Sequence, residues 1–529
     1  LMSQHFSAIA AAGPIVGPIA ACLAVGWLPA LLWIVVGVVL IGAVHDFSAL
    51  VASVRHGAHS VADIAKQHLG KRAYLALVAF IWIALLYVIL AFTAVTADTF
   101  KGVSEDLAGA RGTFNKGGAV AAASAMYLVL ALIMGVCQRY LKAPVWLLTL
   151  IFVPATLGCV WLGTSVGQSW NLPVNAWYAI ILGYCLVASM LPMWLLQQPR
   201  GYLGGFVLYI AIAVGLAGVL AGGFTIEYPA VMDQLLFPFL FVTIACGACS
   251  GFHGLICGGT TSRQIAKESH CRPIGFGAML LEGLVAVIAL STVMILTSQA
   301  AAKAGAPAQI YGDGLASFFV ALVTGGARAQ EGSALWLFAA TFGAMAFSTF
   351  VFDTLDVSTR LGRYLLQELF RTPGKVAGVL AAGATAGVPL AVLLLAEPGS
   401  WRQFWTLFGT SNQLLAALTL LGVTVWLYKS GKRVWYVFLP MLFVMAVTLT
   451  ALSIQIWLGV RAGMDGAWRI APAAAGGGGS GGRLNPVIVN AAVAIALLGL
   501  GLAFIVQGMR AAARVRRERA GAPAASPAA

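Results

Sequence analysis

Charged residues are scarce in this chain of 529 residues: they make up 9% of the sequence, whereas hydrophobic residues make up 60%. A soluble domain carries roughly 25% charged residues. So few charges cannot cover a water-facing surface of this size, so most of the surface must face lipid. The composition therefore excludes an ordinary soluble protein and predicts an all-α polytopic membrane protein.

Other protein classes are disfavoured by motifs that the sequence lacks. It has no G-x-x-x-x-G-K-[ST] loop, so ATP-driven transport is not expected. It has no repeated filter motif, which disfavours a channel. No convergent nucleophile and base are visible, so neither an enzyme nor a cofactor is expected. The interpretation that remains is a secondary transporter, with a nutrient sensor or a channel without coupled transport as the alternative.

The basic residues give a net charge of +14, but they form short clusters between apolar stretches. This distribution disfavours a nucleic-acid partner and indicates a protein oriented in a lipid bilayer. If the chain begins inside, most Lys and Arg fall on cytoplasmic connections, so both termini are predicted to be cytoplasmic. The eight cysteines lie mostly in apolar stretches, where thiols behave as small hydrophobes, and no disulfide framework is expected.

Long apolar stretches are abundant, and a spanning helix needs about 20 such residues. A shorter stretch at 311–324 is interpreted as a re-entrant or interfacial segment. The sequence predicts about fourteen transmembrane helices, at 6–26, 28–51, 73–97, 117–137, 144–164, 176–197, 202–223, 236–260, 274–298, 334–354, 375–396, 404–428, 434–459 and 486–507.

The chain divides into four predicted regions. Ser60, Asp63 and Gly70 suit the two ends of a short amphipathic helix between the second and third spans. The regions are a transmembrane core over 1–470, a glycine-rich linker over 471–485, a final span over 486–507 and a basic, disordered cytoplasmic tail over 508–529.

The first span contains two Gly-Pro pairs one turn apart, Gly13-Pro14 and Gly17-Pro18. Each proline removes an amide donor and frees the carbonyl four residues earlier. In lipid, such groups need protein or a wet cavity as partner, and broken helices supply ion and substrate ligands in many transporters. Residues 13–18 are therefore predicted to be non-helical or sharply kinked, with a kink packed against neighbours as the purely structural alternative.

A second irregular segment covers 245–263 and holds five glycines between 247 and 259. A glycine-packed helix beside a polar cavity would satisfy its polar side chains, and a satisfied core histidine is the alternative for His253. The candidate pathway residues here are Ser250, His253, Thr260 and Thr261. The sequence predicts that His253, Thr260 and Asn412 share one cavity near the first break.

Three cysteines and His253 also fall near one helical face of this segment: Cys246, Cys249 and Cys257. A metal site is one interpretation of this pattern. No metal is expected, however, because paired Cys-x-x-Cys ligands normally sit on loops and the sequence shows no obvious carboxylate that would hold the second ring nitrogen of His253.

Glu282 lies eight residues into an otherwise apolar span, where a charge costs roughly 2.5–3.5 kcal/mol. It should therefore be paired or protonated, and it is the first candidate for proton coupling, with a fixed ion pair as the alternative. Its own span contains no basic residue, so a partner must come from another helix; His253 is the candidate by residue type. Asp46, beside His45 in the second span, is either an interfacial cap or a functional acid.

Asp353 and Asp356 lie three residues apart on one face of a span. Asp356 is predicted to pair with a basic residue at the cytoplasmic face, most simply Arg360 one turn further on, and a coupling or gating role is the alternative. Asn412 and Gln413 interrupt another span; they either line the cavity or hold helices together.

Several of these motifs together resemble the carbon starvation protein (CstA) family. They are His-Phe-Ser-Ala-Ile-Ala at 5–10 with the following Gly-Pro pairs, Gly-Ala-Val-His-Asp-Phe at 42–47, the segment 239–263, Gly-Ala-Met-Leu-Leu-Glu at 277–282, Leu-Asp-Val-Ser-Thr-Arg at 355–360 and Leu-Phe-Gly-Thr-Ser-Asn-Gln at 407–413. The resemblance runs from residue 5 to about 455. Asp356 matches the family pattern, whereas Asp353, Cys249 and Cys257 stand outside it.

The resemblance implies a bacterial inner-membrane transporter induced by nutrient stress, with pyruvate or peptides as substrate and a proton or sodium as coupling ion. It also implies the amino acid–polyamine–organocation superfamily, and hence a LeuT-type core of two inverted repeats. Family members usually begin with a further hydrophobic helix before the His-Phe motif, and that helix is expected to be missing here.

Overall fold

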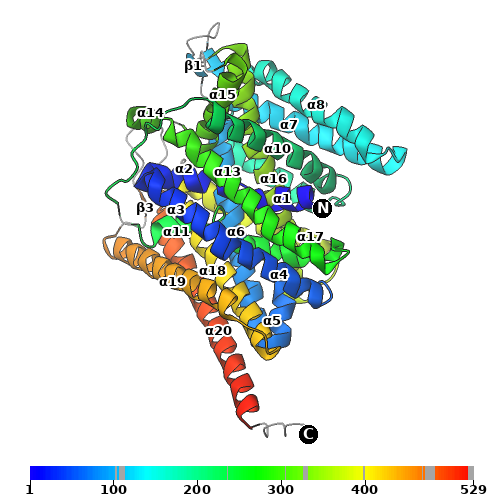
Figure 1. The fold of residues 1–529 in the computed structure, drawn as a ribbon, viewed down its shortest axis with the longest axis vertical. Helices are drawn as coiled ribbons and strands as arrows, with labels where there is room; N and C mark the ends of the chain where they lie inside the picture. Colours follow the sequence, from blue (N-terminus) through cyan, green and yellow to red (C-terminus); the bar gives the residue numbers. More distant parts are fainter. Residues whose placement is uncertain are drawn as a thin grey trace.

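The computed structural model describes residues 1–101, 104–106, 113–234, 236–303, 305–325, 332–396, 400–466, 469–470 and 483–521. In these ranges the chain is a bundle of helices with two short antiparallel strand pairs (Figure 1). The strands are β1 (Ser104–Asp106) with β2 (Thr113–Asn115), and β3 (Arg469–Ile470) with β4 (Arg483–Leu484).

The first half of the chain forms ten α-helices in its described part, and a π-helical turn, Val38–Gly42, joins the third to the fourth. They are α1 (Met2–Ala10), α2 (Gly13–Val25), α3 (Trp27–Gly37), α4 (Ala43–Arg55), α5 (Val61–Leu69), α6 (Lys71–Phe100), α7 (Lys116–Val136), α8 (Val145–Val166), α9 (Val174–Met190) and α10 (Gln197–Ala221).

The described part of the second half adds ten more α-helices, and irregular helical turns follow α12, among them the π-helical turn Cys257–Thr261. The helices are α11 (Phe239–Thr243), α12 (Gly251–Ile256), α13 (Gly277–Met294), α14 (Ser298–Lys303), α15 (Pro307–Thr324), α16 (Ala334–Phe370), α17 (Lys375–Leu395), α18 (Trp401–Lys429), α19 (Trp435–Met464) and α20 (Pro486–Gly521).

In the described residues, 11 helices are long and apolar enough to cross a membrane, or up to 12 if the bent pair α1–α2 is one span. The predicted count of fourteen is therefore wrong, and three predicted spans explain the difference. The stretch 6–26 is the bent pair, 176–197 forms only the 17-residue helix α9, and 236–260 is broken between α11 and α12. Apolar length alone does not detect glycine and proline breaks.

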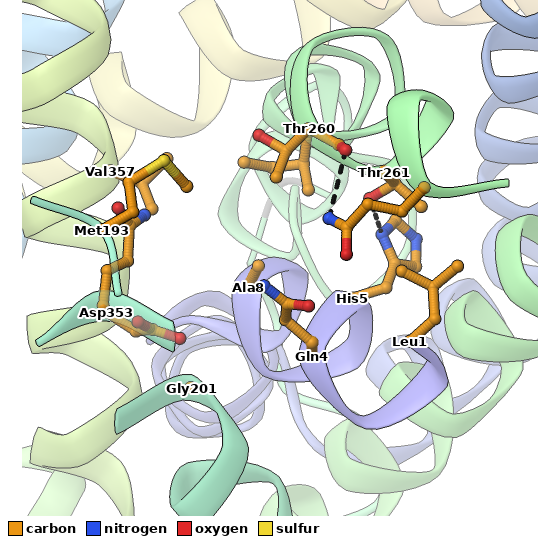
Figure 2. Close-up of a pocket in the computed structure, with 13 residues that line it drawn as sticks. Leu1, Gln4, His5, Ala8, Met193, Gly201, Thr260, Thr261, Asp353 and Val357 are labelled. Carbon is orange, nitrogen blue, oxygen red and sulfur yellow. Dashed lines mark hydrogen bonds between the residues drawn. The ribbon is translucent and has the colours of Figure 1, made fainter. Parts of the chain in front are cut away.

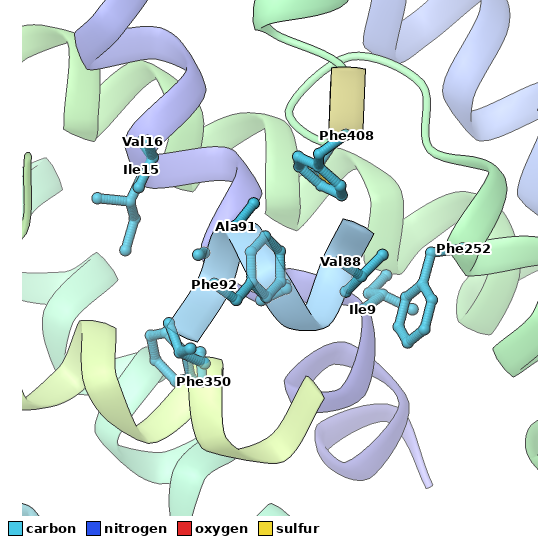
Figure 3. Packing of buried hydrophobic residues seen from close by; sticks show 14 of the residues in the cluster. Ile9, Ile15, Val16, Val88, Ala91, Phe92, Phe252, Phe350 and Phe408 are labelled. Carbon is cyan, nitrogen blue, oxygen red and sulfur yellow. The ribbon is translucent and has the colours of Figure 1, made fainter. Parts of the chain in front are cut away.

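The centre of the bundle is formed by α6, α16 and α18. In the most apolar 18-residue stretch of each helix, 94% of the residues of α18 and 83% of those of α16 are buried. In the stretch that contains α8 the share is only 28%. Aromatic side chains fill this centre, as where Phe92 of α6 meets Phe408 of α18 edge-on with ring centroids 5.0 Å apart. Figure 3 shows this packing around the bend between α1 and α2, with Ile9, Ile15, Val16, Val88, Ala91, Phe92, Phe252, Phe350 and Phe408.

The predicted amphipathic helix at 60–70 is confirmed as α5. The Ser60 hydroxyl accepts a hydrogen bond from the Asp63 amide at 3.1 Å, and Gly70 ends the helix with φ 101°. These end signals are local in sequence, so they could be located without the fold.

The C-terminal region differs from its prediction. Helix α20 continues to Gly521, so 508–521 are helical rather than disordered, and the helix extends beyond the rest of the bundle (Figure 1). Ala511 and Val515 are buried one turn apart, and the Arg519 guanidinium donates to the Tyr428 carbonyl at 2.6 Å. Most of the predicted linker, 471–482, and residues 522–529 of the tail lie outside the described residues.

Candidate functional site

The chain bends by 40° between α1 and α2. The break lies at Ala11 and Ala12, and Ala11 has φ 32°, a conformation unusual for a residue with a side chain. The first segment is broken, but the prediction that 13–18 are non-helical or sharply kinked is wrong, because the break precedes Gly13 and 13–18 lie within α2. Proline is favoured in the first turn of a helix, so Pro14 starts α2 rather than interrupting it. Pro18 lies inside α2.

A second break faces the first. Residues 244–250 are not helical and separate α11 from α12. A Cβ atom on Gly13 would lie 2.0 Å from the Cβ of Cys246, and one on Gly17 would lie 2.7 Å from the Thr243 carbonyl oxygen. The two glycines therefore let α2 approach the broken segment more closely than any larger residue would permit.

Asn412 and Gln413 of α18 hold the second break in place. The Asn412 side-chain oxygen accepts from the Phe252 amide at 2.9 Å, and its amide nitrogen donates to the Ser250 hydroxyl at 3.0 Å. Gln413 donates to the Phe241 carbonyl at 2.9 Å. Of the two interpretations of this polar pair, the contacts match the one in which it holds helices together.

A group of buried ionisable side chains forms what we call the histidine–carboxylate cluster. It consists of His45, Asp46, His253 and Glu282, all fully buried. The two Asp46 oxygens accept from His45 Nδ1 at 2.7 Å and from His253 Nδ1 at 2.8 Å. The other ring nitrogen of His253 lies 3.2 Å from Glu282 Oε2. The predicted partnership of Glu282 with His253 is thus confirmed, and Asp46 lies in the buried first turn of α4 rather than at an interface.

This geometry offers two neighbouring positions for one mobile proton. His253 Nδ1 carries a hydrogen because it faces an acceptor-only carboxylate. The remaining proton can then sit on His253 Nε2 or on Glu282, which face each other. Without it, two buried carboxylates would have no compensating charge, which is costly in a bilayer. The cluster can therefore hold one exchangeable proton.

A second cluster, the arginine cluster, joins α9, α10 and α16. Arg200 is fully buried and contacts Asp353 at 2.7 Å, and it also donates to Asp356 and to the Tyr184 hydroxyl. Asp356 is paired with a basic residue, as predicted, but that residue is Arg200 and the choice of Arg360 is wrong.

Arg360 donates instead to the Ala188 and Leu191 carbonyls at the end of α9, at 2.8 and 2.7 Å. Arg200 is hard to identify from the sequence, because the polar run at 197–200 resembles a connection rather than the first turn of a helix.

Helix α1 lies between the two clusters. His5 Nδ1 lies 2.8 Å from the Thr261 hydroxyl, and the Ser7 hydroxyl donates to Asp353 Oδ2 at 3.0 Å. A pocket opens between these contacts and includes Thr260 in its wall (Figure 2). His253 and Asn412 do not line this pocket, so the structure does not bring Thr260 into one cavity with them.

The family of the chain follows from its similarity to known proteins. The sequence matches the family described as carbon starvation protein CstA over residues 1–331 and 306–451. The chain belongs to the CstA family. Both breaks and both buried clusters fall within the matched residues.

Three relatives illustrate the CstA family. The peptide transporter CstA of Mycobacterium tuberculosis is 34% identical, and the match covers 85% of this chain and 67% of that protein. The peptide transporter CstA of Escherichia coli is 32% identical over 85% of this chain and 73% of that protein. The pyruvate/proton symporter BtsT of Escherichia coli is 30% identical over 86% and 74%. These CstA relatives are named as transporters and not as enzymes.

Among solved structures, a manganese transporter from Eremococcus coleocola aligns with 98% of this CstA-family chain and 94% of its own length, at 13% identity and a TM-score of 0.49. A likeness of this size carries no inference about shared architecture or cargo.

Proposed function

We propose that this chain is a proton-coupled symporter that imports a small carboxylate such as pyruvate, or a short peptide. The names of its relatives support this class of activity, since they include peptide transporters and a pyruvate/proton symporter. The distribution of basic residues supports a bacterial inner-membrane location with both termini in the cytoplasm.

The observation that carries the proposal is the position of His253 between Asp46 and Glu282. All three side chains are fully buried. An imidazole between two carboxylates can accept and release a proton, whereas sodium requires a shell of oxygen ligands that the ring nitrogens do not supply. The coupling ion that fits this cluster is therefore a proton.

The cluster lies where movement of the helices would reach it. His253 belongs to α12, directly after the second break, and α12 also contacts α1. A rearrangement of either broken segment would change the surroundings of His253 and hence the stability of its proton. Loading from one side and release to the other then follow from alternating access.

The same pair of breaks supports an inverted-repeat core. We place the bent pair α1–α2 and the broken segment α11–α12 as the corresponding discontinuous helices of two LeuT-type repeats, as in the amino acid–polyamine–organocation superfamily. They face each other across Gly13 and Gly17, and substrate sites of such transporters lie between broken helices.

Uptake into proteoliposomes tests the proposed function. Labelled pyruvate and labelled dialanine are offered with an inward proton gradient, with an inward sodium gradient and with neither. Accumulation of one substrate driven by the proton gradient is expected. Accumulation driven only by sodium, or no accumulation of either compound, would contradict the proposal.

A further inference from the structure

A groove opens on the surface of the bundle between α4, α18 and the first turn of α19; Figure 1 shows α4 and α19 side by side. The π-helical turn Arg272–Phe276, which leads into α13, forms its remaining side. The empty space, including the open mouth, is about 1620 Å³. Its lining residues lie between Val44 and Tyr436, so neither end of the chain contributes to the wall.

The polar side chains gather at one end of this groove. Arg55 is the last residue of α4, and Arg272 is the first residue of the π-helical turn. Glu268 and Ser269 belong to the short helical turn just before it. All four residues are exposed. With both termini placed in the cytoplasm, this end of the groove faces the cytoplasmic leaflet, whose surface carries anionic lipids.

Pairing among these residues leaves one positive charge. Arg55 donates to Glu268 Oε1 from two nitrogens, at 3.0 and 2.6 Å. Glu268 is the one acidic residue that the described lining contains. The guanidinium of Arg272 makes no ion pair with any of the described residues. A planar guanidinium suits the geometry of a phosphate group, so this end of the groove is complementary to an anionic phosphate.

The rest of the wall is apolar and aromatic. Phe47 and Val51 of α4 face Trp426 and Leu427 of α18 across the groove. Tyr436 of α19 also lines it. Tryptophan and tyrosine are enriched where a membrane protein meets the boundary between lipid and water. The wall therefore combines one charged end with a surface suited to a hydrocarbon chain.

The apolar surface continues beyond the groove. Leu40, Leu280 and Leu439 each lie about one helical turn from a groove residue on the same segment, on the side away from the charged end. They are 60%, 41% and 57% exposed. A ligand with a phosphate at one end and long hydrocarbon chains at the other matches this order, whereas a small carboxylate would leave the apolar wall uncovered.

We propose that this groove binds an anionic phospholipid, with its phosphate at Arg272 and an acyl chain along the apolar side chains of α4 and α18. Basic pockets between transmembrane helices on the cytoplasmic side are known to bind anionic lipid headgroups. The lipid would remain bound rather than be transported, so the site goes beyond the proposed function and is independent of it.

Native mass spectrometry and thermal unfolding of the purified full chain in detergent test this assignment. The probes are dioleoylphosphatidylglycerol, the zwitterionic dioleoylphosphatidylethanolamine, and glycerol 3-phosphate, which has a phosphate without chains. The phosphatidylglycerol should bind at least about tenfold more tightly than the phosphatidylethanolamine and raise the unfolding temperature more. Glycerol 3-phosphate should do neither. This comparison needs no variant, so it remains decisive if a substitution prevents folding.

Two matched variants locate the site. Arg272→Gln should weaken binding of the phosphatidylglycerol about tenfold and leave the weak binding of the phosphatidylethanolamine unchanged. Arg263→Gln makes the same chemical change at an exposed arginine that does not line the groove, so it should bind like the wild type. Equal effects of the two variants, or wild-type affinity in Arg272→Gln, would overturn the assignment.

The remaining outcomes identify other occupants. Equal binding of the two lipids would show adhesion of acyl chains alone and overturn the anionic site. Tight binding of glycerol 3-phosphate would indicate a site for a soluble phosphate and overturn the lipid. A lipid-free dimer that Phe47→Arg dissociates would assign the groove to a second copy of the chain, and it would likewise overturn the proposal.

Discussion

At the scale of single residues, the main feature is that buried carboxylates lie beside basic side chains. A charged side chain at the centre of a bilayer costs roughly 2.5–3.5 kcal/mol on insertion scales, so charges there must be paired or have a function. The histidine–carboxylate cluster and the arginine cluster both satisfy this requirement with residues from different helices. The two clusters differ in one respect: only the first contains histidine side chains.

Within the arginine cluster, Arg200 is predicted to contribute more to the stability of the fold than Asp353 or Asp356 does. Arg200→Ala would leave Asp353 and Asp356 buried without a cation, and losing one partner of a buried pair costs about 3–5 kcal/mol. Folded yield and the thermal unfolding temperature in detergent should both fall sharply. Adding Asp353→Asn and Asp356→Asn to Arg200→Ala should restore part of the loss. No change in unfolding temperature for Arg200→Ala would show that the cluster does not stabilise the fold.

A pH-dependent contact is predicted at the end of α5. His68 is half-buried; this burial, with smaller contributions from His56 and Lys429, lowers the pKa of His68 from 6.5 to about 4. His68 Nε2 lies 2.9 Å from His56 Nε2. Because the unfolded state binds the proton more readily than the folded state, stability should fall as pH decreases from about 6.5 to 4.

Thermal unfolding across this pH range measures the effect. His68→Gln cannot be protonated and should lose less stability on acidification than the wild type does. His270→Gln, at an exposed position, should behave like the wild type and serves as the control. If His68→Gln and the wild type lose the same stability on acidification, protonation of His68 is not the cause of the loss.

At the scale of elements, the two broken segments depend on close backbone approach. Gly13 of α2 would place a Cβ atom within 2.0 Å of the Cys246 side chain, and Gly409 of α18 would place one 2.0 Å from the Val242 carbonyl oxygen. Overlaps of this size cannot be relieved by a rotamer change, because they involve a Cβ atom and a backbone oxygen.

Gly13→Ala is therefore predicted to lower the unfolding temperature, by a destabilisation of roughly 1–3 kcal/mol from overpacking. Gly158→Ala is the matched control, because Gly158 lies inside α8 and no atom of the described residues comes within 4 Å of a new Cβ atom there. The control should be neutral or slightly stabilising, since alanine favours a helix more than glycine does. Equal unfolding temperatures for Gly13→Ala and the wild type would contradict the close packing of the breaks.

Features that depend on neighbouring residues can be predicted from the sequence, whereas contacts between residues far apart in the chain cannot. Helix α5 was predicted because Ser60, Asp63 and Gly70 mark its ends locally. The bend near Gly13 was predicted from its prolines, but its position was wrong by two residues because Pro14 is compatible with a first turn. Asp356 was assigned the nearby Arg360, whereas its partner Arg200 lies 156 residues away and depends on the packing of α10 against α16.

At the scale of the whole molecule, the orientation in the membrane remains a prediction. If both termini are cytoplasmic, the connection at 56–60 and the end of α20 lie on the same side, and the connection at 167–173 lies on the other. His59→Cys and Arg516→Cys should then react with a membrane-impermeant maleimide only after cells are opened, and Ser169→Cys should react in intact cells. Labelling of His59→Cys in intact cells would reverse the predicted orientation.

The histidine–carboxylate cluster gives the most direct test of the proposed mechanism. Glu282→Gln retains the shape of the protonated acid but cannot release a proton, so it should permit substrate exchange while preventing accumulation. The control is Glu268→Gln, which changes an exposed acid paired with Arg55 outside the cluster.

The decisive measurement is uptake of the labelled substrate by proteoliposomes containing Glu282→Gln, with an inward proton gradient and, separately, with unlabelled substrate inside. If Glu282 carries the coupling proton, Glu282→Gln should show no proton-driven accumulation and an exchange rate close to that of the wild type and of Glu268→Gln. Accumulation by Glu282→Gln at the wild-type level under the proton gradient would contradict it.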